Sequence, residues 1–256
     1  MSLQVKVDRE LQFVCGEAYH SGNITGRPSY RNLKVIYDDF FGKAIDSAYD
    51  WTVGSATGTD CTATITTPDC LTLTSGTVDE AQLTVCGALG FYGTYGCAIE
   101  VRARNDDVDE LRHFIGFSDL AATEMPFLYS GTTLTSSASD AAGFILDMDA
   151  TLDRYYGVSV NTNSDGAVIN SGNVGTADSA WKTYRVEIVP NGTAADAYFY
   201  LNTSGNEIDP EADIIGYEAA AVAPAVALGP NVSIQHNGTS SETLDVDYIK
   251  VWGGRY

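Results

Sequence analysis

Short segments in which apolar and polar residues alternate follow one another from Leu33 to the end of the chain. Glycine, asparagine and aspartate mark turns between them. The clearest segments read CTATITT, LTLTS, AQLTVCG, CAIEVRAR, HFIGFSD, GFILDMD, YYGVSVNT, YRVEIVP, AYFYLNT, VSIQH and LDVDYIKVW. Threonine, valine, isoleucine and tyrosine dominate these segments, and such residues favour half-buried pleated surfaces. The pattern predicts an all-β protein, an antiparallel β-sandwich or a barrel.

The segment CAIEVRAR, residues 97–104, shows which face of a strand enters the core. Successive side chains of a strand point to opposite faces, so one face must carry the charged residues of this segment. The best register points Ile99, Val101 and Ala103 into the core. The glutamate and arginines between them are then expected on the outside of the sheet.

Two parts of the chain depart from this alternation. Residues 210–228 have some helical composition, but Gly216 and Pro224 limit any helix there to a short one. Residues 1–32 combine two strand-like stretches with the turn-rich sequence HSGNITGRPSY. We therefore expect an N-terminal arm or extra strands at 1–32, and a single sandwich domain over 33–256.

The composition supports a folded and strongly acidic domain. Hydrophobic residues make up 44% of the chain, which supplies a core, and the net charge is −20. Residues 1–32 carry four basic and three acidic residues, so the rest of the chain, with ten basic and 31 acidic residues, has a net charge of −21. Binding to phosphates needs clustered lysine or arginine, so we expect neither nucleic acid nor an anionic membrane as a partner.

The start of the chain and its cysteines bear on the cellular compartment. The first residues alternate instead of forming the apolar stretch of roughly 7–15 residues that a secretion signal needs. The five cysteines lack CxxC spacing, so we do not expect a zinc site. They are either reduced thiols of a protein made in the cytosol, or they include a bridge across neighbouring strands, Cys61–Cys70 or Cys86–Cys97.

Five motifs together resemble concanavalin A-like lectin/glucanase domains, also described as laminin G-like. In chain order they are YDDFFGKAIDSAYDW (37–51), CAIEVRAR (97–104), HFIGFSD (113–119), WKTYRVEIVPNGTAADAYFYLNTSGNEI (181–208) and LDVDYIKVW (244–252). The resemblance spans nearly the whole chain and implies a jelly-roll sandwich. It says little about activity, because function depends on sites that differ between proteins of one fold.

Glucanases with this fold resemble one another through an acidic triplet, Glu-x-Asp-x-(x)-Glu, along one strand. A retaining mechanism needs two carboxyl groups about 5 Å apart. The nearest match here is Asp147 and Asp149, which share a face, but a third partner is missing because Asp153 lies beyond an expected turn. GxSxG, HExxH and phosphate-binding glycine motifs are also absent from the sequence. We therefore expect no enzymatic activity.

The resemblance also implies one cofactor, a structural calcium ion between the opening segment and the closing strand. By motif position its ligands would be Asp39 and Asp247. Calcium needs six to eight oxygen ligands, and the sequence has no DxDxDG loop. The competing interpretation, which we favour, is that these aspartates hydrogen-bond to the backbone and hold the terminal strands together.

Exposed aromatic side chains next to polar residues are typical of carbohydrate-binding sandwiches. The candidates are Tyr92 and Tyr95 in the glycine-rich segment GALGFYGTYG, and the pair Tyr155 and Tyr156. The competing interpretation of the first two is a tight hairpin whose aromatics cover one end of the sandwich. The three tryptophans lie in the resemblance motifs, where we expect them to pack in the core or at a sheet edge.

The main functional hypothesis from the sequence is a non-enzymatic virion protein. The order of EVRARNDD, HFIGFSD, a polar loop, AAGFILDMDA and WKTYRVEI resembles concanavalin A-like structural proteins of tailed bacteriophages. This implies a capsid decoration or cement protein in the virion, assembled in the host cytoplasm. Its partners would be the major capsid protein or other virion proteins, and it would form a homo-oligomer, with a trimer as one candidate. The alternative is a carbohydrate-binding adhesion module, and a glycoside hydrolase ranks third.

Overall fold

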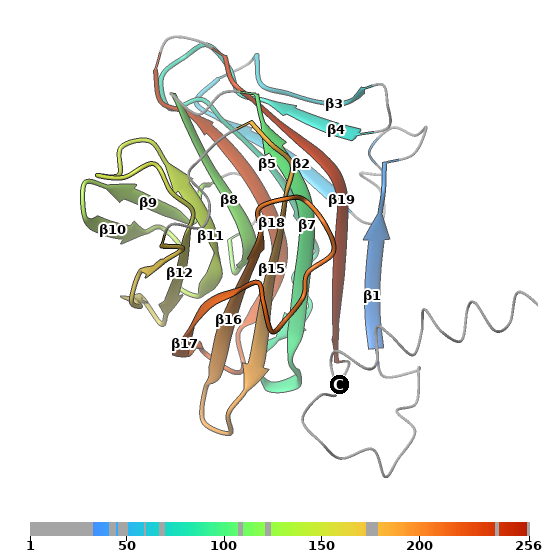
Figure 1. Ribbon diagram of the computed structural model, residues 1–256, viewed down its shortest axis with the longest axis vertical. Helices are drawn as coiled ribbons and strands as arrows, with labels where there is room; N and C mark the ends of the chain where they lie inside the picture. The colour runs from blue at the N-terminus through green and yellow to red at the C-terminus, as the bar shows by residue number, and fades with distance from the viewer. Residues whose placement is uncertain are drawn as a thin grey trace, which may run out of the picture.

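The computed structural model describes residues 33–40, 45, 51–58, 60–66, 70–106, 110–120, 124–172, 179–238 and 241–254. Two large antiparallel sheets, here called sheet A and sheet B, pack face to face (Figure 1). The described ranges contain no α-helix, and only a short 3-10 turn spans Gly93–Tyr95. They also contain no helix long and apolar enough to cross a membrane. The predicted antiparallel sandwich is confirmed, whereas the predicted arm at 1–32 lies outside the described residues.

Sheet A joins the first described strand of the domain to its last. Across the sheet the strands are β17 (Ile214–Val222), β16 (Ala195–Asn202), β15 (Lys182–Pro190), β7 (Cys97–Asn105), β19 (Thr243–Gly254), β4 (Cys70–Thr74) and β3 (Thr62–Thr66). The strand β1 (Leu33–Asp38) also pairs with β19, so β19 has β7 on one side and both β4 and β1 on the other. All of these pairings are antiparallel.

Sheet B forms the second layer. Its strands, in order across the sheet, are β13 (Ser164–Asp165), β12 (Tyr156–Asn161), β11 (Ala141–Asp147), β8 (Leu111–Ser118), β18 (Ala227–His236), β5 (Gln82–Gly87) and β2 (Trp51–Ala56). Two short strands extend it, β14 (Ile169–Asn170) beside β12 and β6 (Phe91–Tyr92) beside β18. A separate hairpin consists of β9 (Phe127–Ser130) and β10 (Thr133–Ser136).

The main core lies between the two sheets and follows the predicted alternation. Ile99, Val101 and Ala103 of β7 are at most 1% exposed and belong to this core, as the sequence predicts. Phe144 of sheet B packs edge-on against Phe199 of sheet A, with ring centroids 5.8 Å apart. Burying a side chain of this size contributes about 1.5–3 kcal/mol. Each sheet therefore has an inner apolar face and an outer face on which polar residues can gather.

The segment with helical composition forms an edge strand instead of a helix. Residues 214–222 are β17, which pairs with β16, and the pairing shifts register at two points. Hydrogen bonds to a neighbouring strand outweigh the weak helical preference of the alanines and glutamates in this segment. The short helix that the composition allows is therefore not formed.

A second, smaller core lies on the outer face of sheet B. The hairpin β9–β10 lies against this face beside β11 and β12 (Figure 1). The ring of Phe127 from the hairpin lies 5.7 Å from that of Phe114 on β8, and Tyr129 lies 4.8 Å from Tyr156 on β12. The hairpin thus covers part of a sheet face that would otherwise be open to solvent.

The side chain of His113 is fully buried in the main core. His113 of β8 donates from Nδ1 to Oδ1 of Asn105 at 3.0 Å. Its ring stacks on Tyr155 and meets Tyr184 edge-on, with both centroid distances at 5.9 Å. Burial lowers the pKa of His113 from 6.5 to about 3, because the charged imidazolium loses its hydration. The side chain is therefore neutral at pH 7.

Candidate functional site

The acidic pair Asp147 and Asp149, the nearest match to the glucanase triplet, forms part of an ion-pair network. Arg112 on the neighbouring strand β8 donates from Nε to Asp147 at 2.5 Å and from Nη2 to Asp149 at 3.1 Å. The backbone N–H of Tyr129 also donates to Asp147 at 2.7 Å, and Arg112 Nη1 donates to Gln235 at 2.7 Å. Both oxygens of Asp147 are therefore engaged, since Oδ1 accepts the N–H of Asp149.

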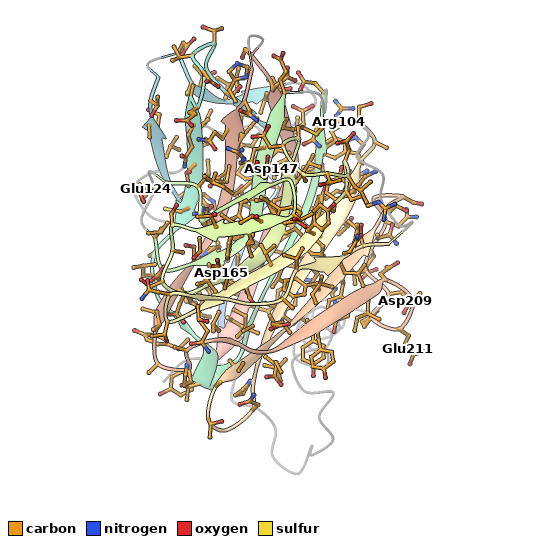
Figure 2. The ribbon with its side chains drawn as sticks, turned by 90° about the vertical axis from the view of Figure 1, so that its left-hand side faces the viewer. Arg104, Glu124, Asp147, Asp165, Asp209 and Glu211 are labelled. Atoms are coloured by element: carbon orange, nitrogen blue, oxygen red, sulfur yellow. The ribbon has the colours of Figure 1, made fainter. Side chains whose placement is uncertain are left out.

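The surroundings of Asp147 are equally closed. Its side chain has no exposed surface, and Figure 2 shows it near the centre of the view, whereas Asp209 and Glu211 project at the edge. Two residues earlier on the same face stands Ile145, which is buried in the core beneath the hairpin β9–β10. At these positions, therefore, the outer face of sheet B is covered by the hairpin β9–β10 at Ile145, and Asp147 is enclosed in its ion pair with Arg112.

The four tyrosines predicted to contact carbohydrate do not form one site. Tyr95 is 45% exposed and lies edge-on to the half-buried Tyr92, with ring centroids 6.3 Å apart. Tyr155 is 0% and Tyr156 is 4% exposed, so the prediction that they are exposed is wrong. Neighbouring residues point to opposite sides: Tyr155 enters the main core, and Tyr156 packs in the second core near the hairpin β9–β10.

The two aspartates predicted as calcium ligands have different surroundings. Asp247 forms an ion pair with Arg102 at 2.8 Å, so its charge has a partner within the chain. Asp39 is exposed, and it is Asp38 that accepts hydrogen bonds from the Phe40 backbone and the Trp51 indole at 2.9 and 3.0 Å. Among the described residues, no three His, Cys, Asp or Glu side chains are placed to hold a metal ion.

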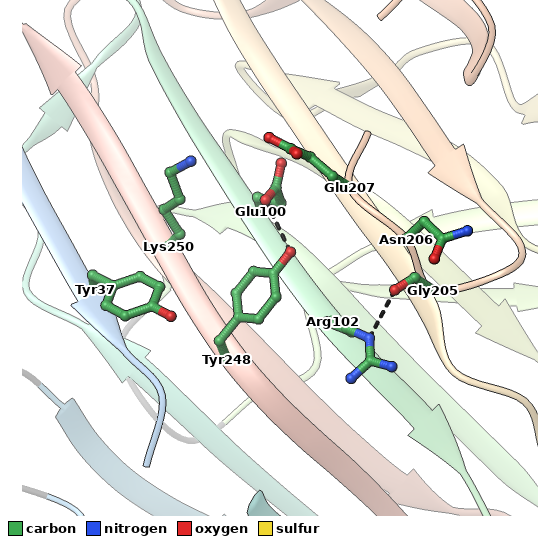
Figure 3. A pocket seen from close by; sticks show the side chains of 8 residues that line it. All are labelled: Tyr37, Glu100, Arg102, Gly205, Asn206, Glu207, Tyr248 and Lys250. Carbon is green, nitrogen blue, oxygen red and sulfur yellow. Dashed lines mark hydrogen bonds between the residues drawn. The ribbon is translucent and has the colours of Figure 1, made fainter. Parts of the chain in front are cut away.

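A pocket of about 310 Å³ opens on the outer face of sheet A (Figure 3). It lies between β1, the neighbouring strands β19 and β7, and the loop that follows β16. Its lining combines aromatic, charged and amide groups: Tyr37, Glu100, Arg102, Gly205, Asn206, Glu207, Tyr248 and Lys250. A few convergent polar groups beside apolar surface are typical of small-molecule sites.

Strand register brings the pocket residues together from distant parts of the sequence. Tyr37 of β1 pairs with Lys250 of β19, which pairs in turn with Glu100 of β7. Paired residues share a face of the sheet, and the residues between them, such as Ile99 and Ile249, enter the core. The alternation that builds the core therefore also places the pocket residues on the outer face.

The loop after β16 closes one side of the pocket and is held in place by specific bonds. Asn202 Oδ1 accepts the backbone N–H groups of Ser204 and Asn206 at 3.0 and 3.2 Å. Arg102 Nε donates to the carbonyl of Gly205 at 2.8 Å. Gly205 has a φ of 64°, and a Cβ there would lie 2.8 Å from Trp181. This close approach requires glycine.

Charged groups in the floor of the pocket neutralise one another. Glu100 is 4% exposed and accepts a hydrogen bond from Nε of Arg185 at 2.7 Å, and Nη2 of the same arginine lies 2.5 Å from the same carboxylate oxygen as an ion pair. The hydroxyl of Tyr248 donates to the other oxygen of Glu100 at 2.9 Å. Burial, together with the nearby Glu100 carboxylate, raises the pKa of Tyr248, so its hydroxyl keeps its proton. The floor of the pocket is therefore polar, and the charges of Glu100 and Arg185 in it compensate each other.

Two tyrosine rings supply the apolar surface of the pocket. Tyr37 is 59% exposed, and its ring centroid lies 6.2 Å from that of Tyr248 with a tilt of 32°. Asn206 and Glu207 are also exposed, on the loop opposite. Sequence reasoning missed these residues because Tyr37 and Tyr248 lie inside motifs that were interpreted as framework. The signal that could have found them is the alternation of their strands, which places both tyrosines on the face opposite to the core residues.

Comparison with solved structures decides the fold family. The chain matches the carbohydrate recognition domain of Emp47p with a TM-score of 0.58, 13% identity and coverage of 90% of this chain and 100% of that one. It matches an endo-1,3-beta-glucanase from Streptomyces sioyaensis with a TM-score of 0.55, 12% identity and coverage of 91% and 100%. The fold is a concanavalin A-like lectin/glucanase sandwich. A protein of unknown function, SO2946 from Shewanella oneidensis MR-1, matches this concanavalin A-like domain with a TM-score of 0.54, 11% identity and coverage of 100% and 95%.

At the level of sequence, the concanavalin A-like domain matches no family model and no curated protein. Because the structural matches have such low identity, they establish the fold alone. None of the three proteins named above is described as a virion component, so they lend no support to the predicted capsid role. The predicted virion location, capsid partner and homo-oligomer remain predictions.

Proposed function

We propose that this concanavalin A-like domain is a carbohydrate-binding module without catalytic activity, and that the pocket on sheet A is its binding site. The observation that carries the proposal is the pair Tyr37 and Tyr248, whose rings border a pocket rich in hydrogen-bonding groups. The alternative hypothesis from the sequence thereby replaces the virion hypothesis as the leading one.

The chemistry of a sugar fits this combination of groups. A sugar ring has an apolar C–H face and a rim of hydroxyl groups that both donate and accept hydrogen bonds. The exposed ring of Tyr37 offers a flat apolar surface, while Asn206 and Glu207 on the loop offer polar partners. Aromatic side chains give large contact areas at low entropic cost, which suits a shallow site.

Two further observations support the class of ligand and the lack of catalysis. One matched structure is described as a carbohydrate recognition domain and another as a glucanase. On the present chain, the acidic pair closest to the glucanase pattern is bound by Arg112, and Asp147 is fully buried. A general acid or a nucleophile must reach the substrate, and a carboxylate enclosed in this way has no access to one.

Replacing Tyr37 by alanine tests the proposal. We expect wild-type protein to bind neutral glycans on an array, and Tyr37→Ala to weaken binding about tenfold or more, because about 1.4 kcal/mol of ring contact is lost. Titration calorimetry with the best array ligand measures the change. Tyr95→Ala is the matched control, since Tyr95 is similarly exposed but lies elsewhere. Absence of glycan binding, or equal affinity for wild type and Tyr37→Ala, would refute the site.

A further inference from the structure

We propose that the strand β3, Thr62–Thr66, at one edge of sheet A pairs with the same strand of a second copy of this chain. Sheet A would then continue across a dimer with twofold symmetry. The contact involves the edge strand and not the pocket, so it is independent of the proposed carbohydrate binding. An edge strand is suited to such pairing because its free backbone groups can bind another strand.

The strand β3 has a neighbouring strand on one side only. It pairs with β4, and no other strand in the described part of the chain pairs with it (Figure 1). Thr62, Thr64 and Thr66 are all exposed. In an antiparallel ladder, every second residue points its backbone N–H and C=O groups away from the partner strand. The outer edge of β3 therefore presents hydrogen-bonding groups to solvent.

The sequence of β3 is complementary to itself. It reads TATIT, with threonine at both ends and in the centre. In an antiparallel pair centred on Thr64, Thr62 faces the partner subunit's Thr66, and Ala63 faces the partner subunit's Ile65. Opposite residues of paired strands share a face of the sheet. The pairing thus places threonine opposite threonine on one face and apolar residues opposite each other on the other face.

Both faces of β3 match the sheet that a second copy would extend. Ala63 and Ile65 pack against the main core but are only half-buried, so a strand beside them would cover more of their surface. On the outer face, the hydroxyl of Thr66 lies 2.9 Å from that of Thr72, which donates to Asp245 at 2.6 Å. Cross-strand threonine pairs are stabilising, and a partner strand would continue this row of hydroxyl groups.

The lack of charge on this edge suits a partner that is itself strongly acidic. The chain carries 14 basic and 34 acidic residues, but no residue from Cys61 to Pro68 is charged. A residue at the centre of a twofold contact faces its own copy, so a charge there would meet an identical charge. Two copies with a net charge of −20 each therefore approach most easily at an uncharged edge.

The other ends of the two large sheets are less suited to pairing. On β17 the carbonyl of Ala220 accepts a hydrogen bond from Asn161 Nδ2 at 2.7 Å, and the same strand carries Glu218. On sheet B, β13 has only two residues, one of which is Asp165, and β2 contains Gly54, which weakens a strand. Charges and covering groups are common means of protecting an edge from association, and the described part of β3 has neither.

The dimer is expected to be weak and to depend on salt. A contact through five residues of each copy buries less than the 1,200–2,000 Å² or so that is typical of stable complexes. Salt shortens the range of the repulsion between the acidic copies, from about 30 Å at 0.01 M to about 3 Å at 1 M. We therefore expect the association constant to rise about tenfold between low and high salt.

Sedimentation equilibrium of the full chain over a range of protein concentrations, at low and high salt, tests the inference. Two double variants test the register. Thr62→Lys with Thr66→Glu places opposite charges face to face and leaves the net charge unchanged, so it should strengthen association about tenfold at low salt. Thr62→Lys with Thr66→Lys places like charges face to face and should weaken it at least tenfold, although it makes the chain less acidic.

Thr135→Lys is the matched control, because Thr135 is an exposed threonine on β10, the edge of another hairpin. It should leave association within about twofold of wild type. Wild-type protein that stays monomeric at high concentration and high salt would overturn the inference. An equal effect of the two double variants would do the same, as would a dimer weakened by Thr135→Lys, or by Thr52→Lys on β2, instead of by the pair of lysines on β3.

Discussion

Replacing Asp147 by alanine is expected to lower the free energy of unfolding by about 3–5 kcal/mol. The reason is that Arg112, whose side chain is only 6% exposed, would lose its buried partner and keep only the half-exposed Asp149 to compensate its charge. The backbone N–H of Tyr129 would lose its acceptor as well, which weakens the attachment of the hairpin β9–β10. Urea denaturation at pH 7, followed by the fluorescence of the three tryptophans, measures the change.

Two further variants test this explanation. Asp149 also binds Arg112, but its side chain is 46% exposed, so Asp149→Ala should cost at most about 1 kcal/mol. Replacing the pair together, Arg112→Met with Asp147→Leu, should recover most of the lost stability, because no charge remains buried. Equal losses for the two single variants at Asp147 and Asp149 would show that the network is not a buried ion pair.

Acidification from pH 6.5 towards pH 3 is expected to remove stability through His113. The folded protein holds this side chain neutral with a pKa of about 3, whereas the unfolded chain binds a proton near pH 6.5. The unfolded state therefore takes up the proton first, and stability falls as pH falls through this window. The slope reaches about 1.4 kcal/mol per pH unit, so about 2–3 kcal/mol is lost by pH 4.5.

The contribution of His113 is separated from that of other groups by a variant without a titrating side chain. His113→Gln keeps polar atoms near Asn105 but binds no proton in this range. It should be less stable than wild type at pH 7, and its stability should fall less steeply between pH 6.5 and 4. Parallel pH profiles of the two proteins, measured by urea denaturation, would contradict the assignment of the effect to His113.

The fold was predictable from the sequence because its signals are local and linear. Alternation within each strand fixes which side chains enter the core, as Ile99, Val101 and Ala103 illustrate. The order of the five motifs then indicates the sandwich type without any knowledge of contacts. The edge strand β17 was not predictable in this way, since pairing with β16 determines its conformation and composition does not.

The candidate site was less predictable because it depends on contacts between distant segments. Tyr37 and Tyr248 meet only because the first described strand lies beside the last. The buried positions of Tyr155 and Tyr156 have a similar origin. Adjacent residues of a strand must point to opposite faces, but only the docking of the hairpin β9–β10 covers the second of them. No local sequence pattern predicts that the hairpin covers Tyr156.

The position of β19 has a consequence for how the protein folds during translation. This strand, Thr243–Gly254, lies between β7 on one side and both β4 and β1 on the other. While the chain is being translated, β1, β4 and β7 emerge long before the strand that must separate them. The edges of these strands that pair with β19 stay unpaired until translation has passed residue 254, and such edges can associate with other chains. Sheet A thus assembles late, through contacts of the greatest sequence separation, which makes folding slow and favours chaperone protection of the nascent chain.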